Sequence, residues 1–83
     1  MRLRTQQLGL RNKVGARVER KRKELGMKQK DLLARLQVKG IELNSSGLSK
    51  LEGQIRSVND FELIALSEAL GVSVAWLLGL ENE

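Results

Sequence analysis

Apolar residues recur every three or four positions within short segments of this chain, and glycines or capping residues separate the segments. This spacing is typical of amphipathic helices, so the pattern predicts five short helices around one core. Residues 1–12 lack a clean period and are expected to form a basic N-terminal arm, and residues 81–83 an acidic tail. The predicted fold is therefore all-α, with a single five-helix domain over residues 13–80.

The first two predicted helices end at clear stop signals. The first covers about residues 13–25 and ends at Gly26, and its apolar face consists of Val14, Val18 and Leu25. The second covers about residues 29–38 and ends at Gly40, and its inward residues are Leu32, Leu33 and Leu36.

The other three predicted helices are marked by their N-caps. Asn44 or the next serine caps a helix of about ten residues. Asn59 and Glu62 form a capping-box pattern at the start of a fourth helix, and Ser73 caps a short fifth one. In the third helix Leu48 and Leu51 are expected to be buried, and in the fourth Leu63, Leu66 and Leu70 form an apolar row. The fifth helix contains Val74, Trp76, Leu77 and Leu78 and ends before Gly79.

Positive charge is concentrated in the first half of the 83 residues. Residues 1–40 hold 13 of the 15 lysines and arginines and carry a formal charge of +10, whereas residues 41–83 carry −5. Such a field is typical of proteins that bind a polyanion, either nucleic acid or an anionic membrane surface. A solvated basic face without a partner is the alternative.

The composition argues against several classes of function. The chain has no cysteine and no histidine, which excludes disulfides, thiolate or imidazole metal sites, and catalysis by a Cys or His side chain. We expect no enzyme activity, no metal, no cofactor and no small-molecule ligand. The longest apolar stretch, residues 74–80, is far shorter than the roughly 20 residues of a membrane span, so a cytoplasmic protein without a membrane partner is expected.

Two consecutive short helices joined by a glycine-containing turn, the second with a polar outer face, are typical of a helix-turn-helix. Three segments support this interpretation, and they are RKELGMKQKDLLARL, GLSKLEGQ and DFELIALSEALGVSVAWLLG. Over about residues 13–80 the chain resembles the Cro and phage-repressor (xenobiotic-response-element) family of transcriptional regulators. The resemblance implies a five-helix DNA-binding domain in which residues 29–36 form the first helix of the motif and residues 45–53 the recognition helix.

The resemblance also implies a function. The protein would be a sequence-specific regulator, a repressor, that places its recognition helix in the major groove of double-stranded DNA. A domain of this size contacts one half-site, so a homodimer on a pseudo-palindromic site is expected. By resemblance the dimer contact lies at the C-terminal end, and its candidate residues are Trp76, Leu77 and Leu80.

The outer side of the recognition helix, opposite its leucines, supplies the candidate base contacts Ser45, Ser46, Ser49 and Lys50. Lys50 can reach guanine O6 and N7, whereas serine hydroxyls discriminate poorly. Specificity can also come from DNA shape, from bridging water, or from the arm residues Arg2, Arg4 and Arg11 in an adjacent groove. The alternative for the arm is a disordered, weakly attracted tail.

Other candidate residues position the domain on DNA. Gln29 is expected to contact phosphate at a helix N-terminus, or only to cap that helix, and the further phosphate contacts are Lys28, Lys30, Arg56 and Asn59. In similar proteins the residues matching Arg22 and Glu52 form an ion pair, which would be structural. The alternative for Arg22 is one more solvated cation.

The sequence departs from the family pattern at three places. The stretch Gln37 to Leu43 makes the turn longer than in the shortest members. Leu33 stands where a small alanine is usual, so it either widens the packing or leaves Ala34 to fill that role, and Ser67 replaces another common alanine.

Three rival interpretations remain. The main rival is a repressor-like fold that acts as a protein-interaction module without specific DNA binding. A basic amphipathic helix for a membrane surface or a calmodulin-type partner would have few apolar anchors at residues 13–25. RNA binding would have little stacking surface, because the chain holds one Phe and one Trp.

Overall fold

The computed structural model describes residues 13–81, and this part of the chain contains five α-helices and no strand. The helices are α2 (Lys13–Glu24), α3 (Gln29–Val38), α4 (Ser45–Glu52), α5 (Asp60–Leu70) and α6 (Val74–Leu77). The prediction of an all-α fold with five helices is confirmed. The predicted arm with Arg2, Arg4 and Arg11 lies outside the described residues, as does the end of the predicted acidic tail.

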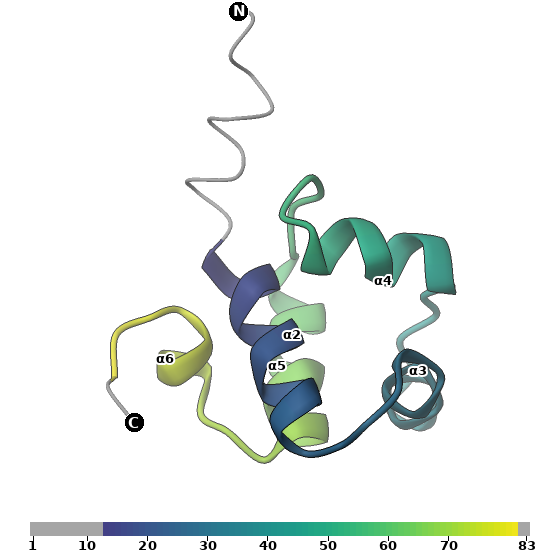
Figure 1. Ribbon diagram of the computed structural model, residues 1–83, viewed down its shortest axis with the longest axis horizontal. Helices are drawn as coiled ribbons and strands as arrows, with labels where there is room; N and C mark the ends of the chain where they lie inside the picture. Colours follow the sequence, from purple (N-terminus) through teal and green to yellow (C-terminus); the bar gives the residue numbers. More distant parts are fainter. Residues whose placement is uncertain (1–12, 82–83) are drawn as a thin grey trace, which may run out of the picture.

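The helices α2 and α5 form the centre of the molecule, with α5 behind α2 in the view of Figure 1. On one side α3 and α4 pack against them and against each other, and on the other side lies the short α6. None of these helices is both long enough and apolar enough to cross a lipid bilayer. The arrangement places α4 along one edge of the bundle, with its outer side away from the core (Figure 1).

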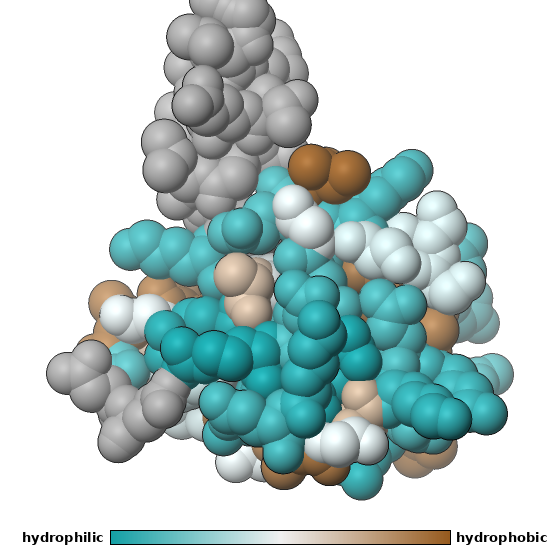
Figure 2. All heavy atoms as spheres, viewed as in Figure 1, coloured by the Kyte–Doolittle hydropathy of each residue, from teal (hydrophilic) through white to brown (hydrophobic). Residues whose placement is uncertain are grey.

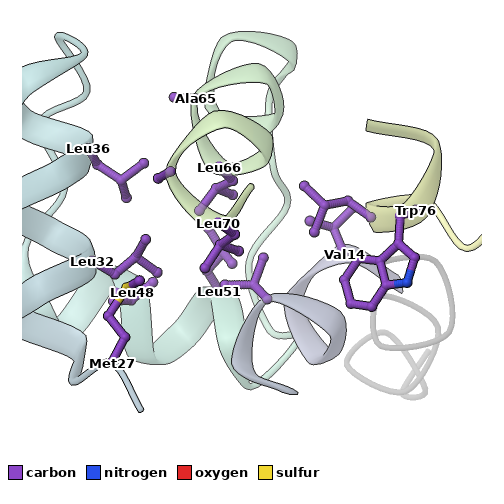
Figure 3. Close-up of a cluster of buried hydrophobic side chains, with 13 residues drawn as sticks. Val14, Met27, Leu32, Leu36, Leu48, Leu51, Ala65, Leu66, Leu70 and Trp76 are labelled. Carbon is purple, nitrogen blue, oxygen red and sulfur yellow. The ribbon is translucent and has the colours of Figure 1, made fainter. Parts of the chain in front are cut away.

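The core is built mainly from leucines of α3, α4, α5 and α6, and α2 contributes Val14 and Val18 (Figure 3). Seven of its side chains are almost completely inaccessible to solvent, and they are Val18, Leu32, Leu36, Leu48, Leu51, Leu66 and Leu77. Burial of one such side chain contributes about 1.5–3 kcal/mol relative to leaving it exposed. The inward positions of the helical pattern therefore supply the main driving force for this fold.

The predicted N-caps of the last three helices are confirmed. The Asn44 side chain accepts a hydrogen bond from the Gly47 N–H, and the Ser73 hydroxyl accepts one from the Trp76 N–H. At α5 the capping box is complete, because Asn59 Oδ1 accepts from the Glu62 N–H while Glu62 Oε1 accepts from the Asn59 N–H. These bonds satisfy backbone donors that the first helical turn leaves unpaired.

The prediction that Leu25 belongs to the inward face of the first helix is wrong. Leu25 is exposed, because α2 ends at Glu24 and Gly26 turns the chain with a φ of 69°, so that Met27 enters the core instead. Leu78 is exposed, because α6 ends at Leu77. Leu63, in the predicted apolar row of α5, is partly buried and packs against the core.

The structure also shows which residue of α3 packs against the core and how long α4 is. Ala34 is exposed and does not mediate helix packing, whereas Leu33 is partly buried against the core. The helix α4 has eight residues rather than about ten, because Gly53 ends it.

The long turn between α3 and α4 is anchored on the core. Gly40 adopts a φ of 84°, which favours glycine, and the Ile41 N–H then donates to the Leu36 carbonyl at 2.9 Å. Ile41 and Leu43 pack against the core cluster. The additional residues of this turn therefore give α4 a defined connection to α3.

Candidate functional site

The outer side of α4 carries four exposed polar side chains in one group. Ser45, Ser46, Ser49 and Lys50 are all exposed, whereas Leu48 and Leu51 on the opposite side of the helix are fully buried. The structure therefore brings the four predicted base-contact residues together on one surface, as their helical spacing predicts.

A buried ion pair holds the C-terminal end of α4 against α2. Arg22 Nε donates to Glu52 Oε2 at 2.7 Å and Arg22 Nη2 donates to Glu52 Oε1 at 3.1 Å. Arg22 Nη1 also donates to the Met27 carbonyl at 2.8 Å, and both side chains are buried. The hydrogen bond to Glu52 raises the pKa of Arg22. The expected pair is present, and Arg22 is not a solvated cation.

Gln29 connects this ion pair to the outer side of α4. Its Nε2 donates to Glu52 Oε1 at 3.1 Å, and its Oε1 accepts from the Ser49 hydroxyl at 3.5 Å. Gln29 does not cap its helix, because the N-cap position of α3 is Lys28, whose N–H donates to the Asp31 carboxylate. The sequence carries no signal of this link, since Glu52 lies 23 positions away.

Cations border the polar side of α4 next to Gln29. Lys28 and Lys30, at the start of α3, are exposed, and so is Lys50 on α4 itself. The basic helix α2 covers the near face of the molecule, where Figure 2 shows mostly hydrophilic residues. The outer group of α4 thus holds one cation, Lys50, and no acidic side chain.

Arg56 and Asn59, two predicted phosphate contacts, already have partners within the fold. Arg56 donates through Nη1 and Nη2 to the two carboxylate oxygens of Glu62 at 3.0 and 2.7 Å. This pairing raises the pKa of Arg56 and lowers that of Glu62. Asn59 caps α5 through its side chain. No pattern in the sequence indicated the Arg56–Glu62 pair.

The three predicted dimer residues differ in their exposure to solvent. Trp76 and Leu77 are buried within the chain, whereas Leu80 is exposed. The Arg17 guanidinium stacks on the Trp76 ring at 4.1 Å from its centroid, and Arg17 Nε donates to the Trp76 carbonyl. In Figure 3 the ring of Trp76 lies beside Val14 at the edge of the core. Trp76 and Leu77 are therefore core residues that attach α6, and they offer no accessible contact surface.

The helices α2 and α4 cross closely at Gly15, which the sequence pattern did not predict. A Cβ atom on Gly15 would lie 1.9 Å from the Leu51 carbonyl oxygen, so a side chain at this position would collide with the backbone of α4. Gly15 thus allows α2 to approach the end of α4 closely. The only signal in the sequence was a glycine within a helical segment.

Within residues 13–81 no group of three or more acidic side chains could hold a metal ion. Comparison of the chain with protein-family models, curated proteins and solved structures gives no match. The functional interpretation therefore depends on the geometry and charge of the α4 surface.

Proposed function

We propose that the protein is a sequence-specific double-stranded DNA-binding regulator of transcription, and that it represses. In this proposal α3 and α4 form a helix-turn-helix and α4 enters the major groove. The supporting observation is the exposed polar side of α4, with Ser45, Ser46, Ser49 and Lys50 bordered by lysines. The protein would act in the cytoplasm, on the nucleoid, as a homodimer and without a cofactor.

The attachment of α4 supports a role in base recognition. Direct readout needs side chains that are held in place before DNA binds, because discrimination depends on hydrogen-bond geometry. Leu48 and Leu51 fix one side of α4 in the core, and the Arg22–Glu52 pair fixes its end. Gln29 extends this support to Ser49 on the outer side.

Charge supports a role in phosphate binding. Lys50 is exposed on α4, and Lys28 and Lys30 are exposed on either side of Gln29, which contacts Ser49. In the proposal the sugar–phosphate backbones flank the inserted helix and meet these lysines. Arg56 would have to share or exchange its Glu62 partner in order to reach a phosphate. We therefore assign the main phosphate contacts to Lys28 and Lys30, and give Arg56 and Asn59 a smaller part.

In vitro selection from a random duplex library tests this proposal. We expect the intact chain to enrich a two-fold symmetric site whose affinity falls steeply with salt. Lys50→Gln should then lose discrimination at one guanine per half-site, by about 1–3 kcal/mol. The control Lys23→Gln removes another exposed charge, from α2, where Lys23 pairs with Glu19, and should not change the preferred base.

Two outcomes would contradict the proposal. Binding without an enriched sequence would indicate contacts to the DNA backbone alone. No binding at low salt would favour the alternative that this fold is a protein-interaction module.

A further inference from the structure

The polar contacts between the buried ion pair and the outer side of α4 form one chain of hydrogen bonds. Arg22 donates twice to the Glu52 carboxylate. Gln29 Nε2 donates to Glu52 Oε1 at 3.1 Å, and the Ser49 hydroxyl donates to Gln29 Oε1 at 3.5 Å. Arg22 and Glu52 are buried, Gln29 is half-buried and Ser49 is exposed. We call this chain the Ser49 relay, and it runs from the interior to the outer side of α4.

The inner contacts of the relay fix which end of the Gln29 amide faces Glu52. A guanidinium only donates hydrogen bonds, and a carboxylate only accepts them. If the Gln29 amide turned over, its oxygen would face Glu52 Oε1, and two acceptors would meet without a proton between them. Glu52 is only 5% exposed, and burial strengthens such a repulsion. The NH2 group of Gln29 therefore points inward, and its carbonyl oxygen points towards Ser49.

The orientation of Gln29 in turn fixes the proton of the Ser49 hydroxyl. A serine hydroxyl has one proton to donate and two lone pairs that accept. Because Gln29 Oε1 can only accept, the Ser49 proton points towards Gln29. The lone pairs of the Ser49 oxygen remain available, and this side chain is exposed. Ser49 thus offers a partner an acceptor and no donor.

The bases of double-stranded DNA differ in the groups that they present to such an acceptor. In the major groove adenine N6 and cytosine N4 carry amino groups that donate, whereas guanine O6 and N7 and thymine O4 accept. To donate to guanine or thymine, Ser49 would have to turn its proton away from Gln29 and leave two oxygens in contact. An amino group of adenine or cytosine can donate to Ser49 while the relay stays intact.

We propose that Ser49 recognises a base with an exocyclic amino group, adenine or cytosine, and that Gln29 is the positioning residue that gives Ser49 this preference. The inference rests on the proposed function, because it needs α4 in the major groove. A serine hydroxyl that rotates freely discriminates poorly, since it both donates and accepts. The relay removes the donor. Lys50, the next residue on the outer side, only donates, so the two neighbours select opposite kinds of base edge.

Removal of one amino group from the selected DNA site tests this assignment. In the site that the wild-type chain enriches, the base whose preference disappears in Ser49→Ala should be adenine or cytosine. Purine in place of that adenine, or 2-pyrimidinone in place of that cytosine, lacks only the exocyclic amino group. We expect the analogue to weaken wild-type binding about 3- to 10-fold, as loss of one neutral hydrogen bond does. Ser49→Ala should bind both DNAs about equally.

A second comparison tests the positioning role of Gln29. In Gln29→Ala the Ser49 hydroxyl has lost its acceptor and can turn outward to donate. This variant should therefore tolerate guanine or thymine at the same base, with discrimination lowered about 3- to 10-fold. A merely structural role would weaken binding to every site alike. The control variants are Gln37→Ala on α3 and Ser46→Ala on the exposed side of α4, and neither should change the preference at this base.

Nuclear magnetic resonance without DNA observes the relay itself. The side-chain amide protons of Gln29 should exchange with water more slowly than those of the exposed Gln37, because Glu52 accepts from Gln29 Nε2. Ser49→Ala should shift the Gln29 amide resonances, and Ser46→Ala should leave them in place.

The possible outcomes separate this inference from the proposed function. Three results would overturn the inference alone: equal exchange at Gln29 and Gln37, guanine or thymine at the base that depends on Ser49, or full wild-type affinity for the DNA analogue. Unchanged discrimination in Gln29→Ala would overturn the positioning role. A chain that enriches no DNA sequence would overturn both the inference and the proposed function, even where the relay is observed.

Discussion

Among single residues, Arg22 and Glu52 attach the C-terminal end of α4 to α2. Their side chains are buried and doubly hydrogen-bonded, and Gln29 adds a third polar contact to the same carboxylate. A buried pair of this kind contributes little net stability, but removal of one partner leaves the other as an uncompensated charge. The pair therefore fixes the position of α4 more than it raises stability.

We expect Glu52→Ala to lower the free energy of unfolding by about 3–5 kcal/mol. The reason is that the Arg22 guanidinium would remain buried without its carboxylate. Urea unfolding followed by circular dichroism measures the loss. The exposed control Glu42→Ala should change stability by less than about 0.5 kcal/mol. An equal effect of both changes would contradict the assignment.

Of the contacts around α4 and α6, the sequence could indicate only those that follow from helical spacing or from the family resemblance. Arg22 and Glu52 could be paired through the resemblance to repressors, and the outer residues of α4 followed from helical spacing. The Gln29–Glu52 bond and the Arg17–Trp76 stacking join residues 23 and 59 positions apart, so they depend on how the helices pack. No local pattern predicts such contacts.

Among the elements, the contact of α2 with the end of α4 depends on Gly15. In a helix without steric conflict, Gly→Ala stabilises by roughly 0.5–1 kcal/mol. At Gly15 the added Cβ would meet the Leu51 carbonyl oxygen at 1.9 Å, and backbone cannot move aside as a flexible side chain can.

We therefore expect Gly15→Ala to destabilise the protein, by at least about 1 kcal/mol, against the helix propensity. Thermal unfolding measures the sign. The adjacent exposed residue provides a control, because Ala16→Gly should cost about 1 kcal/mol through propensity alone. A rise in melting temperature for Gly15→Ala would show that α2 and α4 are not in close contact.

Helix starts were more predictable than helix ends. Asn44, Asn59 and Ser73 cap their helices through bonds to residues three positions away, so the signal is local. The ends depend on where a glycine with positive φ turns the chain and on which side chain then fills the core. For this reason Met27 took the inward place expected of Leu25.

For the whole molecule, Glu62 links stability to pH. Its hydrogen bonds with Arg56 lower its pKa below the ordinary glutamate value of about 4.3. The folded state then binds fewer protons than the unfolded state in the acid range, so stability falls as the pH drops through this window. The stabilisation is fully present above the ordinary value and is lost below the lowered one.

We expect urea midpoints to fall between about pH 5 and pH 3, with part of this loss due to Glu62. Glu62→Gln should lower stability at pH 7 by about 1–2 kcal/mol, because it removes the charge from the Arg56 pair and weakens the α5 cap. The variant should also show a shallower acid dependence than the wild type. An unchanged pH profile would exclude Glu62 as a contributor.

The burial of Trp76 makes the fluorescence of this protein a probe of one site. It is the single tryptophan of the chain, and the chain has no tyrosine, so near-ultraviolet fluorescence comes from one indole ring. That ring joins α6 to α2 and is shielded from water. Emission therefore reports whether the last helix is docked on α2, and a shift to longer wavelength marks exposure of the ring, by detachment of α6 or by unfolding of the whole core.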